Sequence, residues 1–184
     1  MTSNASSSMS RLEATLRQMR RWDDALCLSF AGAQRYAALL WGFRGLSWLG
    51  DGLFWYALML AFLLAFGAQG VAPVLHMMAV GVLCTTTYKL LKRGTSRPRP
   101  YQVLEHVAAG APPLDAFSFP SGHTLHAVAF TLVACSYFPA LAAILVPFTL
   151  LTAASRVVLG LHYPSDVLAG ATVGGSIALV SLAI

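Results

Sequence analysis

Charged side chains are scarce in this chain. Asp, Glu, Lys and Arg make up 10% of its 184 residues, whereas 57% are hydrophobic. An average soluble domain carries about 25% charged residues, so this composition cannot cover the surface of one. It therefore excludes an ordinary soluble protein and predicts an integral membrane protein.

Cysteine is rare as well. The three cysteines lie far apart in apolar segments, at Cys27, Cys84 and Cys135. Neither a pairing pattern nor metal-ligand spacing connects them, so we interpret them as small buried hydrophobic residues. They carry little information about the redox compartment.

Acidic residues are few beside the basic ones. Seven Asp and Glu face twelve Lys and Arg, which gives a formal net charge of +5. The basic residues gather at 11–21 and 89–99, where they suit anionic lipid headgroups or a phosphorylated substrate; the alternative for either patch is an ordinary cytoplasmic-side anchor. We favour the anchor for the first patch, because nothing there fixes a ligand geometry.

The N-terminal segment has the pattern of an amphipathic helix. Residues 1–9 are rich in serine and are expected to be disordered, and Ser10 with Glu13 forms a capping-box pattern. Apolar residues then recur at helical spacing, at Leu12, Leu16, Met19 and Leu26. We therefore expect an interfacial helix within residues 1–24 and a single transmembrane domain over residues 25–184.

Longer apolar stretches follow, at about 46–67, 71–91, 124–159 and 166–184. The third exceeds the roughly 20 residues that span a bilayer, and Pro139 and Pro147 interrupt it. We expect it to form two antiparallel helices with a tight turn near Pro139.

Residues 25–43 decide the number of crossings. Arg35 argues against a crossing by about 2.5–3.5 kcal/mol, whereas the apolar run around Trp41 argues for one. With this crossing there are six helices, and the basic N-terminus lies opposite the polar segments; without it, both lie on one side. We prefer an all-α polytopic bundle of about six transmembrane helices plus the amphipathic helix, with the N-terminus cytoplasmic and the polar segments extracytoplasmic.

Three polar clusters interrupt the apolar chain: 92–100 (KRGTSRPRP), 120–123 (PSGH) and 155–166 (SRVVLGLHYPSD). Ionisable groups beside membrane segments are costly unless they serve a pathway or a site. Each cluster lies at the end of an apolar stretch, and the predicted hairpin brings all three to one side of the membrane. Residues 101–119 between the first two clusters are expected to form an extramembrane loop over them.

The PSGH segment runs straight into a predicted helix. Ser121 is placed as the N-cap, and the backbone N–H groups after it have no partner within the helix, which favours phosphate binding. Gly122 permits a close approach of backbone to ligand, and His123 in the first turn could deliver a proton. Taken alone, the segment could also be only a capped helix start.

His162 and Asp166 are four residues apart across another predicted helix start. The carboxylate can therefore orient the imidazole, although such a pair is more often a cap beside a satisfied histidine. Arg156 favours the catalytic interpretation, because a guanidinium at a membrane helix end needs an anion, and phosphate is its bidentate partner. Lys92 and Arg99 complete the positive charge.

Other basic residues lack comparable context. We interpret Lys89, Arg93 and Arg97 as interface anchors. His76 and His106 are interpreted as structural, and His126 is the outside candidate for the site, because it lies one turn from His123.

The order K-x6-RP, PSGH and SR-x5-H-x3-D resembles the type-2 phosphatidic acid phosphatase family, whose site is shared with vanadium-dependent haloperoxidases. The resemblance covers residues 89–170 closely, and residues 49–52 (LGDG) are a weaker sign. It implies that His162 is the nucleophile that takes the phosphoryl group, held by Asp166, and that His123 protonates the leaving oxygen. Phosphate would be surrounded by Lys92, Arg99, Ser121, Gly122 and Arg156.

The resemblance implies a membrane phosphatase acting on a lipid phosphate or diphosphate. The short chain is similar to small bacterial undecaprenyl-diphosphate phosphatases, while phosphatidylglycerophosphate, phosphatidate and lipid A phosphates remain alternatives. No carboxylate cluster near the site suits magnesium or zinc, so we expect no metal and no cofactor. The expected partners are the bilayer and a lipid substrate, with no nucleic acid. The oligomeric state is left open.

Three other function classes remain. A lipid-to-lipid phosphotransferase would use the same residues, with another lipid as the acceptor instead of water. A non-enzymatic membrane protein would use the clusters to bind anionic lipid or to line an ion path. A haloperoxidase fits less well, because a site embedded in lipid suits an amphiphilic substrate.

Overall fold

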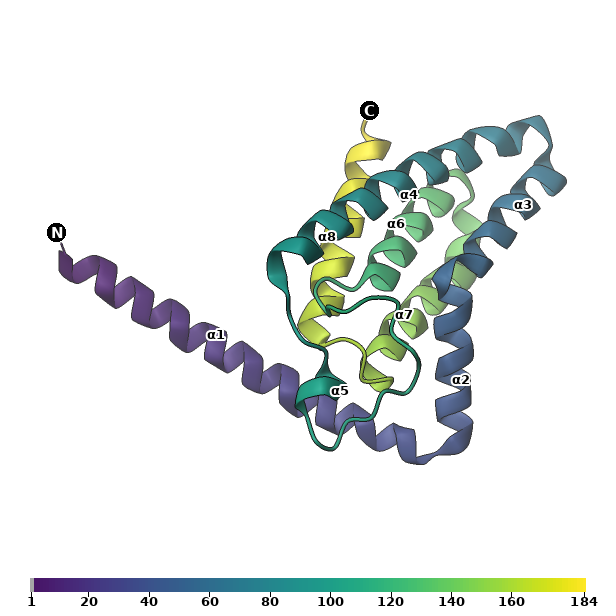
Figure 1. Ribbon diagram of the computed structural model, residues 1–184. Helices are drawn as coiled ribbons and strands as arrows, with labels where there is room; N and C mark the ends of the chain where they lie inside the picture. Colours follow the sequence, from purple (N-terminus) through teal and green to yellow (C-terminus); the bar gives the residue numbers. More distant parts are fainter. Residues whose placement is uncertain (1) are drawn as a thin grey trace.

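The computed structural model describes the backbone of residues 2–184 and the side chains of residues 13–184 (Figure 1). Residues 2–9, which we expected to be disordered, are helical, and Ser10 lies within the first helix rather than at its start; the side-chain contacts of the expected capping box lie outside the described residues. Over the described residues the fold is all-α, as predicted. Its helices are α1 (Thr2–Ala31), α2 (Ala37–Trp48), α3 (Phe54–Phe66), α4 (Ala68–Thr95), α5 (Pro100–Val103), α6 (Gly122–Tyr137), α7 (Ala142–Val158) and α8 (Pro164–Leu182).

In the described part of the chain, four helical stretches are long and apolar enough to cross a membrane: Ala37–Phe66, Ala68–Val103, Pro139–Val158 and Pro164–Leu182. The 16-residue helix α6 packs against α4, α7 and α8 in the middle of the bundle. Its connection to α7 is the short 3-10 turn Pro139–Leu141, so the predicted hairpin is confirmed.

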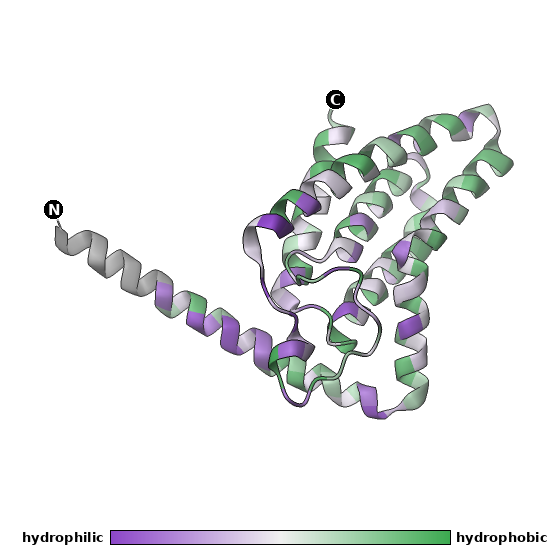
Figure 2. Ribbon diagram, viewed as in Figure 1, coloured by the Kyte–Doolittle hydropathy of each residue, from purple (hydrophilic) through white to green (hydrophobic). Residues whose placement is uncertain are grey.

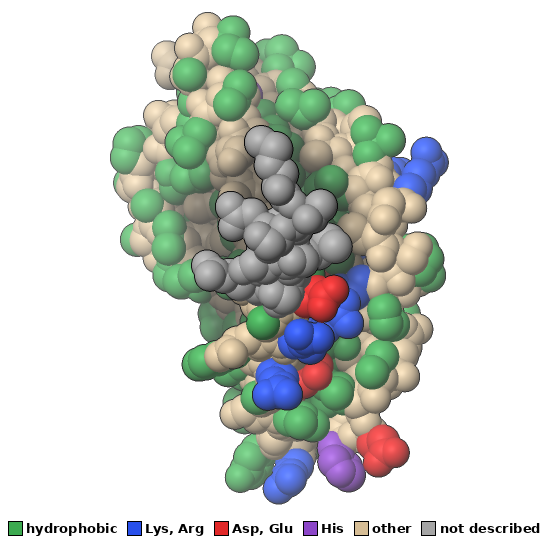
Figure 3. All heavy atoms as spheres, turned by 90° about the vertical axis from the view of Figure 1, so that its left-hand side faces the viewer, with side chains coloured by type: hydrophobic (Ala, Val, Ile, Leu, Met, Phe, Trp, Pro, Cys, Tyr) green, Lys and Arg blue, Asp and Glu red, His purple; other side chains and the backbone are tan. Residues whose placement is uncertain are grey.

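The outer surface of the bundle matches a bilayer. Large apolar side chains on several helices point outward, among them Leu64, Val82, Leu150 and Leu168. Figure 2 shows hydrophobic residues along the bundle and hydrophilic ones on α1 and at the end where the long loop lies. In Figure 3, charged side chains likewise gather toward one end of the molecule.

The crossing expected at residues 25–43 is not formed. These residues are divided between the end of α1, the 3-10 turn Gly32–Arg35 and the first part of α2, and the membrane-spanning stretch joins α2 to α3 instead. Arg35 thus stays at a turn, which avoids the cost of burying its charge in lipid. Among the described residues, the helices that form the bundle are α3, α4, α6, α7 and α8, and a sixth crossing is not confirmed.

Helix α1 lies at the polar end of the bundle (Figure 1). Asp23 on α1 accepts hydrogen bonds from Arg97, at 2.8 Å, and from the backbone N–H of Ser165, at 3.0 Å. The N-terminal helix and the polar clusters thus share one side. The extracytoplasmic position of the site stays a prediction. It rested on a crossing at residues 25–43, and the structure does not provide that support.

Helices α6 and α8 approach each other closely through glycines. A Cβ atom added at Gly170 would lie 2.5 Å from the backbone oxygen of Ser121, and one at Gly174 would lie 2.1 Å from that of Leu125. Small residues permit such backbone contact between membrane helices. The backbone N–H of Ser121 also donates to the carbonyl of Asp166 at 3.1 Å, so the starts of the two helices lie side by side.

Candidate active site

A cavity of about 450 Å³ opens where the three polar clusters meet. Its polar lining includes His123, His162, Lys92, Arg99 and Arg156. Along α4 the lining runs from Lys92 back to Met77, about 22 Å at 1.5 Å per residue, and it is apolar toward Met77. The cavity thus joins a cationic centre to an apolar groove between α3 and α4.

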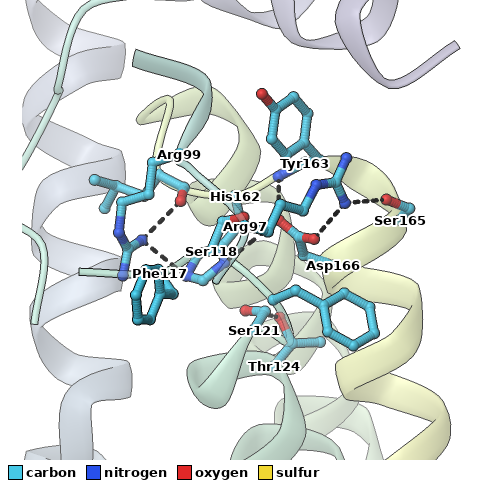
Figure 4. A network of polar contacts seen from close by, with 12 residues as sticks. Arg97, Arg99, Phe117, Ser118, Ser121, Thr124, His162, Tyr163, Ser165 and Asp166 are labelled. Atoms are coloured by element: carbon cyan, nitrogen blue, oxygen red, sulfur yellow. Dashed lines mark hydrogen bonds and ion pairs between the residues drawn. The ribbon is translucent and has the colours of Figure 1, made fainter. Parts of the chain in front are cut away.

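His162 lies in the turn before α8, fully enclosed by the protein (Figure 4). Its Nε2 lies 3.3 Å from Nη1 of Arg99, and its Nδ1 lies 3.8 Å from Oδ2 of Asp166. A guanidinium only donates, so Nε2 accepts and the ring proton is on Nδ1, which lies on the side of the carboxylate but beyond hydrogen-bond distance from it. Burial, together with the charges of Arg156, Arg99 and Lys92, lowers the pKa of His162 well below its ordinary value. The imidazole is therefore neutral, with the lone pair of Nε2 on the cavity side.

Asp166 is 0% exposed and is held at both oxygens. Oδ2 accepts the backbone N–H of Tyr163 at 2.9 Å, which caps the start of α8, and Oδ1 accepts from Arg97 at 2.6 Å. Arg97 also bonds Asp23 and Ser165, and its guanidinium lies 3.9 Å above the ring of Tyr163. The interpretation of Arg97 as an interface anchor is therefore wrong, because it ties Asp166 to α1.

Lys92 and Arg99 converge on a carboxylate that the sequence did not single out. Nζ of Lys92, in the last turns of α4, lies 2.6 Å from Oδ1 of Asp115, and Nη2 of Arg99 lies 2.7 Å from the same oxygen. Burial raises the pKa of Asp115, but the two cations outweigh burial and leave it below the ordinary value. The 101–119 loop thus reaches the site, as expected, and contributes a charge to it.

Arg156 is a buried cation without an anionic partner. It is 2% exposed, Nη1 donates to the hydroxyl of Ser47, and Nε has no hydrogen-bond partner. Among the described residues, no carboxylate forms an ion pair with it. A guanidinium is costly to bury unpaired, and phosphate fits its planar set of donors. The cavity at Arg156 is therefore suited to an anion.

His123 lies in the first turn of α6, with Nε2 3.6 Å from Oδ1 of Asp51. Asp51 belongs to the break between α2 and α3, where Gly52 has a φ of 123° that favours glycine. The LGDG segment, a weak sign in the sequence, thus places a second carboxylate at the cavity.

Ser121 and Gly122 differ in how they face the cavity. Ser121 occupies the predicted N-cap position, but its buried hydroxyl lies 2.9 Å from that of Thr124 and makes no capping bond. Gly122 lines the cavity. A phosphate would thus meet the backbone of the helix start rather than the serine hydroxyl.

The remaining histidines have other partners. His126 lines the cavity, but both of its ring nitrogens are engaged, by the carbonyl of Gly122 at 2.8 Å and the hydroxyl of Thr85 at 3.0 Å. His76 bonds hydroxyls of Tyr137 and Ser181, away from the cavity, and His106 is exposed. Over residues 13–184, no group of three or more His, Cys, Asp and Glu is arranged to hold a metal ion.

The arrangement can be compared with known proteins. The sequence profile of the PAP2 superfamily matches residues 58–184, which contain all three polar clusters. The chain belongs to the PAP2 superfamily.

Two curated relatives of this PAP2 protein are lipid A 1-phosphatases. The enzyme of Rhizobium etli is 32% identical over 125 residues, which cover 62% of this chain and 54% of the relative. The enzyme of Rhizobium johnstonii is 32% identical over 96 residues, which cover 50% of this chain and 39% of the relative. The chain thus spans about half the length of the curated relatives that it matches, or less.

Two crystal structures share the fold. The first transmembrane PAP2 type phosphatidylglycerolphosphate phosphatase from Bacillus subtilis is 25% identical, with a TM-score of 0.73 over 90% of this chain and 85% of that one. Aquifex aeolicus LpxE is 29% identical, with a TM-score of 0.74 over 85% and 93%. Both likenesses extend beyond the matched profile into the N-terminal third.

Proposed function

We propose that this protein is an integral-membrane lipid phosphatase that passes a phosphoryl group to His162 and then to water. The observation that carries the proposal is the buried, unpaired guanidinium of Arg156, in a cavity that also holds Lys92, Arg99, His123 and His162. Phosphoryl transfer depends mainly on positioning and on donors around the phosphate oxygens, and these residues supply both.

In the first step, Nε2 of His162 attacks the phosphorus and forms a P–N bond, while the bond from phosphorus to the lipid oxygen breaks. His123 gives its proton to that oxygen. A lipid monophosphate then leaves as an alcohol, and a lipid diphosphate leaves as a monophosphate. Asp166 stabilises the positive charge of the ring through Nδ1–H. This step requires Arg99 to turn from Nε2 of His162 toward the phosphate oxygens.

In the second step, water attacks the phosphohistidine. His123, now neutral, takes a proton from the water, the P–N bond breaks, and inorganic phosphate leaves with His162 restored. Lys92, Arg99, Arg156 and the N–H groups at Gly122 and His123 would hold the phosphate oxygens throughout. No residue in this scheme needs a metal ion, so we propose metal-independent hydrolysis.

The substrate that we propose is a membrane lipid with a terminal phosphate. The apolar groove between α3 and α4 suits its chains, and the cationic centre suits its headgroup. The names of the relatives favour lipid A 1-phosphate, followed by phosphatidylglycerophosphate, ahead of undecaprenyl diphosphate, to which the sequence alone had pointed. We propose a bacterial inner membrane as the location.

The test is phosphate release in detergent, with EDTA present, from lipid A, phosphatidylglycerophosphate and undecaprenyl diphosphate. Wild type is compared with His162→Ala and with the control His106→Ala, which removes an exposed histidine outside the cavity. We expect release by wild type and the control and none by His162→Ala. Equal release by all three proteins, or none from any lipid, would contradict the proposal; phosphate found on a second lipid would indicate a transferase.

Cysteine labelling tests the arrangement in the membrane. In a background without native cysteines, single cysteines replace Arg20 on α1, His106 in the long loop and Ile184 at the end of the chain. An impermeant maleimide added to intact cells or to inverted vesicles should label positions 20 and 106 from the same side and position 184 from the other. Labelling of positions 20 and 106 from opposite sides would restore the six-helix arrangement.

A further inference from the structure

The position suited to phosphate is filled by a side chain of the protein itself. Asp115 places both carboxylate oxygens on Nζ of Lys92, at 2.6 and 2.5 Å, and shares Oδ1 with Nη2 of Arg99 at 2.7 Å. A carboxylate with two oxygens between an ammonium and a guanidinium has the charge and the geometry with which phosphate binds such groups. Lys92 and Arg99 therefore cannot give these donors to a phosphate while Asp115 remains.

The segment that carries Asp115 is short and is fixed at both ends. On one side, the N–H of Gly110 donates to the carbonyl of Leu159 at 2.9 Å; on the other, that of Ser118 donates to the carbonyl of Arg97 at 2.9 Å. The side chains from 112 to 117 are mostly exposed, and Asp115 itself is partly exposed. Between these ends, the backbone carbonyls of Asp115 and Phe117 accept from Arg99 and Lys92, each at 3.1 Å. The carboxylate can thus leave the cations for solvent by rotation of its side chain, while the backbone of the segment stays in place.

We propose that Asp115 is a specificity-determining residue, whose carboxylate occupies the phosphate position in the free protein and yields only to headgroups that carry a terminal phosphate. The proposal rests on the proposed function, because it takes Lys92 and Arg99 as phosphate-binding residues. A cationic site at the membrane surface faces a large excess of ordinary phospholipids. Their phosphodiester groups would otherwise compete for the same donors.

Charge decides the exchange. A phosphodiester carries one negative charge, as the carboxylate does, so replacing Asp115 with it gains no net attraction. A terminal phosphate carries about −1.5 to −2 near pH 7 and three free oxygens, so it binds Lys92, Arg99 and the unpaired Arg156 together. Asp115 is also tethered beside the cations, at an effective concentration of the order of millimolar or higher, which a weakly binding diester does not overcome.

The test compares Asp115→Asn with wild type by thermal unfolding in detergent, which reads binding without turnover. The probes are inorganic phosphate and phosphatidylglycerol at a fixed detergent ratio. Glu105→Gln is the matched control, because it removes one negative charge from the same loop at an exposed position away from the cavity. Asp115→Glu keeps the charge and tests whether the carboxylate is what matters.

We expect Asp115→Asn to be stabilised by phosphate at about tenfold lower concentrations than wild type, a change that corresponds to about 1.4 kcal/mol, and to be stabilised by phosphatidylglycerol as well. Wild type, Glu105→Gln and Asp115→Glu should respond to phosphate alone. If Asp115 only positions Lys92 and Arg99, Asp115→Asn will bind phosphate more weakly, and the proposal is wrong. A wild type that responds to phosphatidylglycerol as strongly as Asp115→Asn would also overturn it.

The two proposals fail in different ways. If lipid phosphates are hydrolysed but Asp115→Asn binds the probes as wild type does, the role of Asp115 is wrong and the proposed function stands. If no lipid releases phosphate, the proposed function fails. The unfolding measurement still shows which anions bind more tightly when the carboxylate of Asp115 is removed. Should Asp115→Asn not fold, Asp115→Ser is measured in the same way.

Discussion

Replacing Gly170 with alanine should separate the two helices that carry the site. The new Cβ would lie 2.5 Å from the backbone oxygen of Ser121, whereas ordinary contacts begin at 3.4 Å, so α8 must move from α6 by several tenths of an ångström up to about 1 Å. Ser121 lies two residues before His123, and Gly170 lies one turn after Asp166. The displacement therefore falls between the proposed proton donor and the proposed nucleophile.

The expected cost has two parts. Overpacking of this kind destabilises by about 1–3 kcal/mol, and a misplacement of about 1 Å between reacting groups lowers a rate by about 100-fold. Gly175→Ala is the control, since its Cβ would meet Val128 at an ordinary 3.7 Å. Thermal unfolding in detergent and kcat for phosphate release are measured for both. A Gly170→Ala protein with wild-type kcat, or a Gly175→Ala protein that loses as much, would refute the reasoning.

Three further predictions concern Arg97, His162 and the need for a metal ion. Arg97→Ala leaves the carboxylate of Asp166 buried without its cation, so we expect a loss of about 3 kcal/mol in stability and a lower kcat, whereas Arg93→Ala, at an exposed position, should change neither. Because the pKa of His162 lies well below its ordinary value in the folded protein, the unfolded chain takes up the proton first as the pH falls. The stability of wild type relative to His162→Asn should therefore drop by about 1.4 kcal/mol between pH 7.5 and 5.5, as measured by thermal unfolding; an unchanged difference would mean that the folded imidazole also titrates. EDTA should leave the rate of phosphate release unchanged, and a loss restored by Mg²⁺ or Zn²⁺ would contradict a metal-independent reaction.

Local patterns in the sequence were enough to predict much of the fold and the composition of the cavity. Pro139 predicted the turn of the hairpin, because proline cannot continue a helix, and the hairpin then required His123 and Arg156 to meet at one end. Pro164 marked the start of α8. His162 and Asp166 lie on either side of this start, four residues apart, with Nδ1 of His162 3.8 Å from the carboxylate of Asp166.

The contacts that the sequence could not predict join segments far apart in the chain. The ionic partners of Asp115, Asp51 and Asp23 are not near them in the sequence, and only the folded chain brings each to a cation or histidine of another segment. One signal was available for Arg97: a buried acid such as Asp166 needs a cation, and the first cluster offers several. Whether residues 25–43 cross the membrane depended on two opposing free energies, the cost of inserting Arg35 and the gain from the apolar run around Trp41. Insertion energies alone did not decide between them.

The most direct test of the proposed reaction is to trap the phosphorylated protein. Wild type and His162→Ala are mixed for a short time with lipid A that carries radiolabelled phosphate, denatured in base, and examined for label on the protein. The mechanism predicts label on wild type that is stable in base and lost in acid, as a phosphohistidine is, and none on His162→Ala. Label of the same kind on His162→Ala would contradict the role of His162 as the nucleophile. So would phosphate release by wild type with no labelled protein in samples taken within the first turnover.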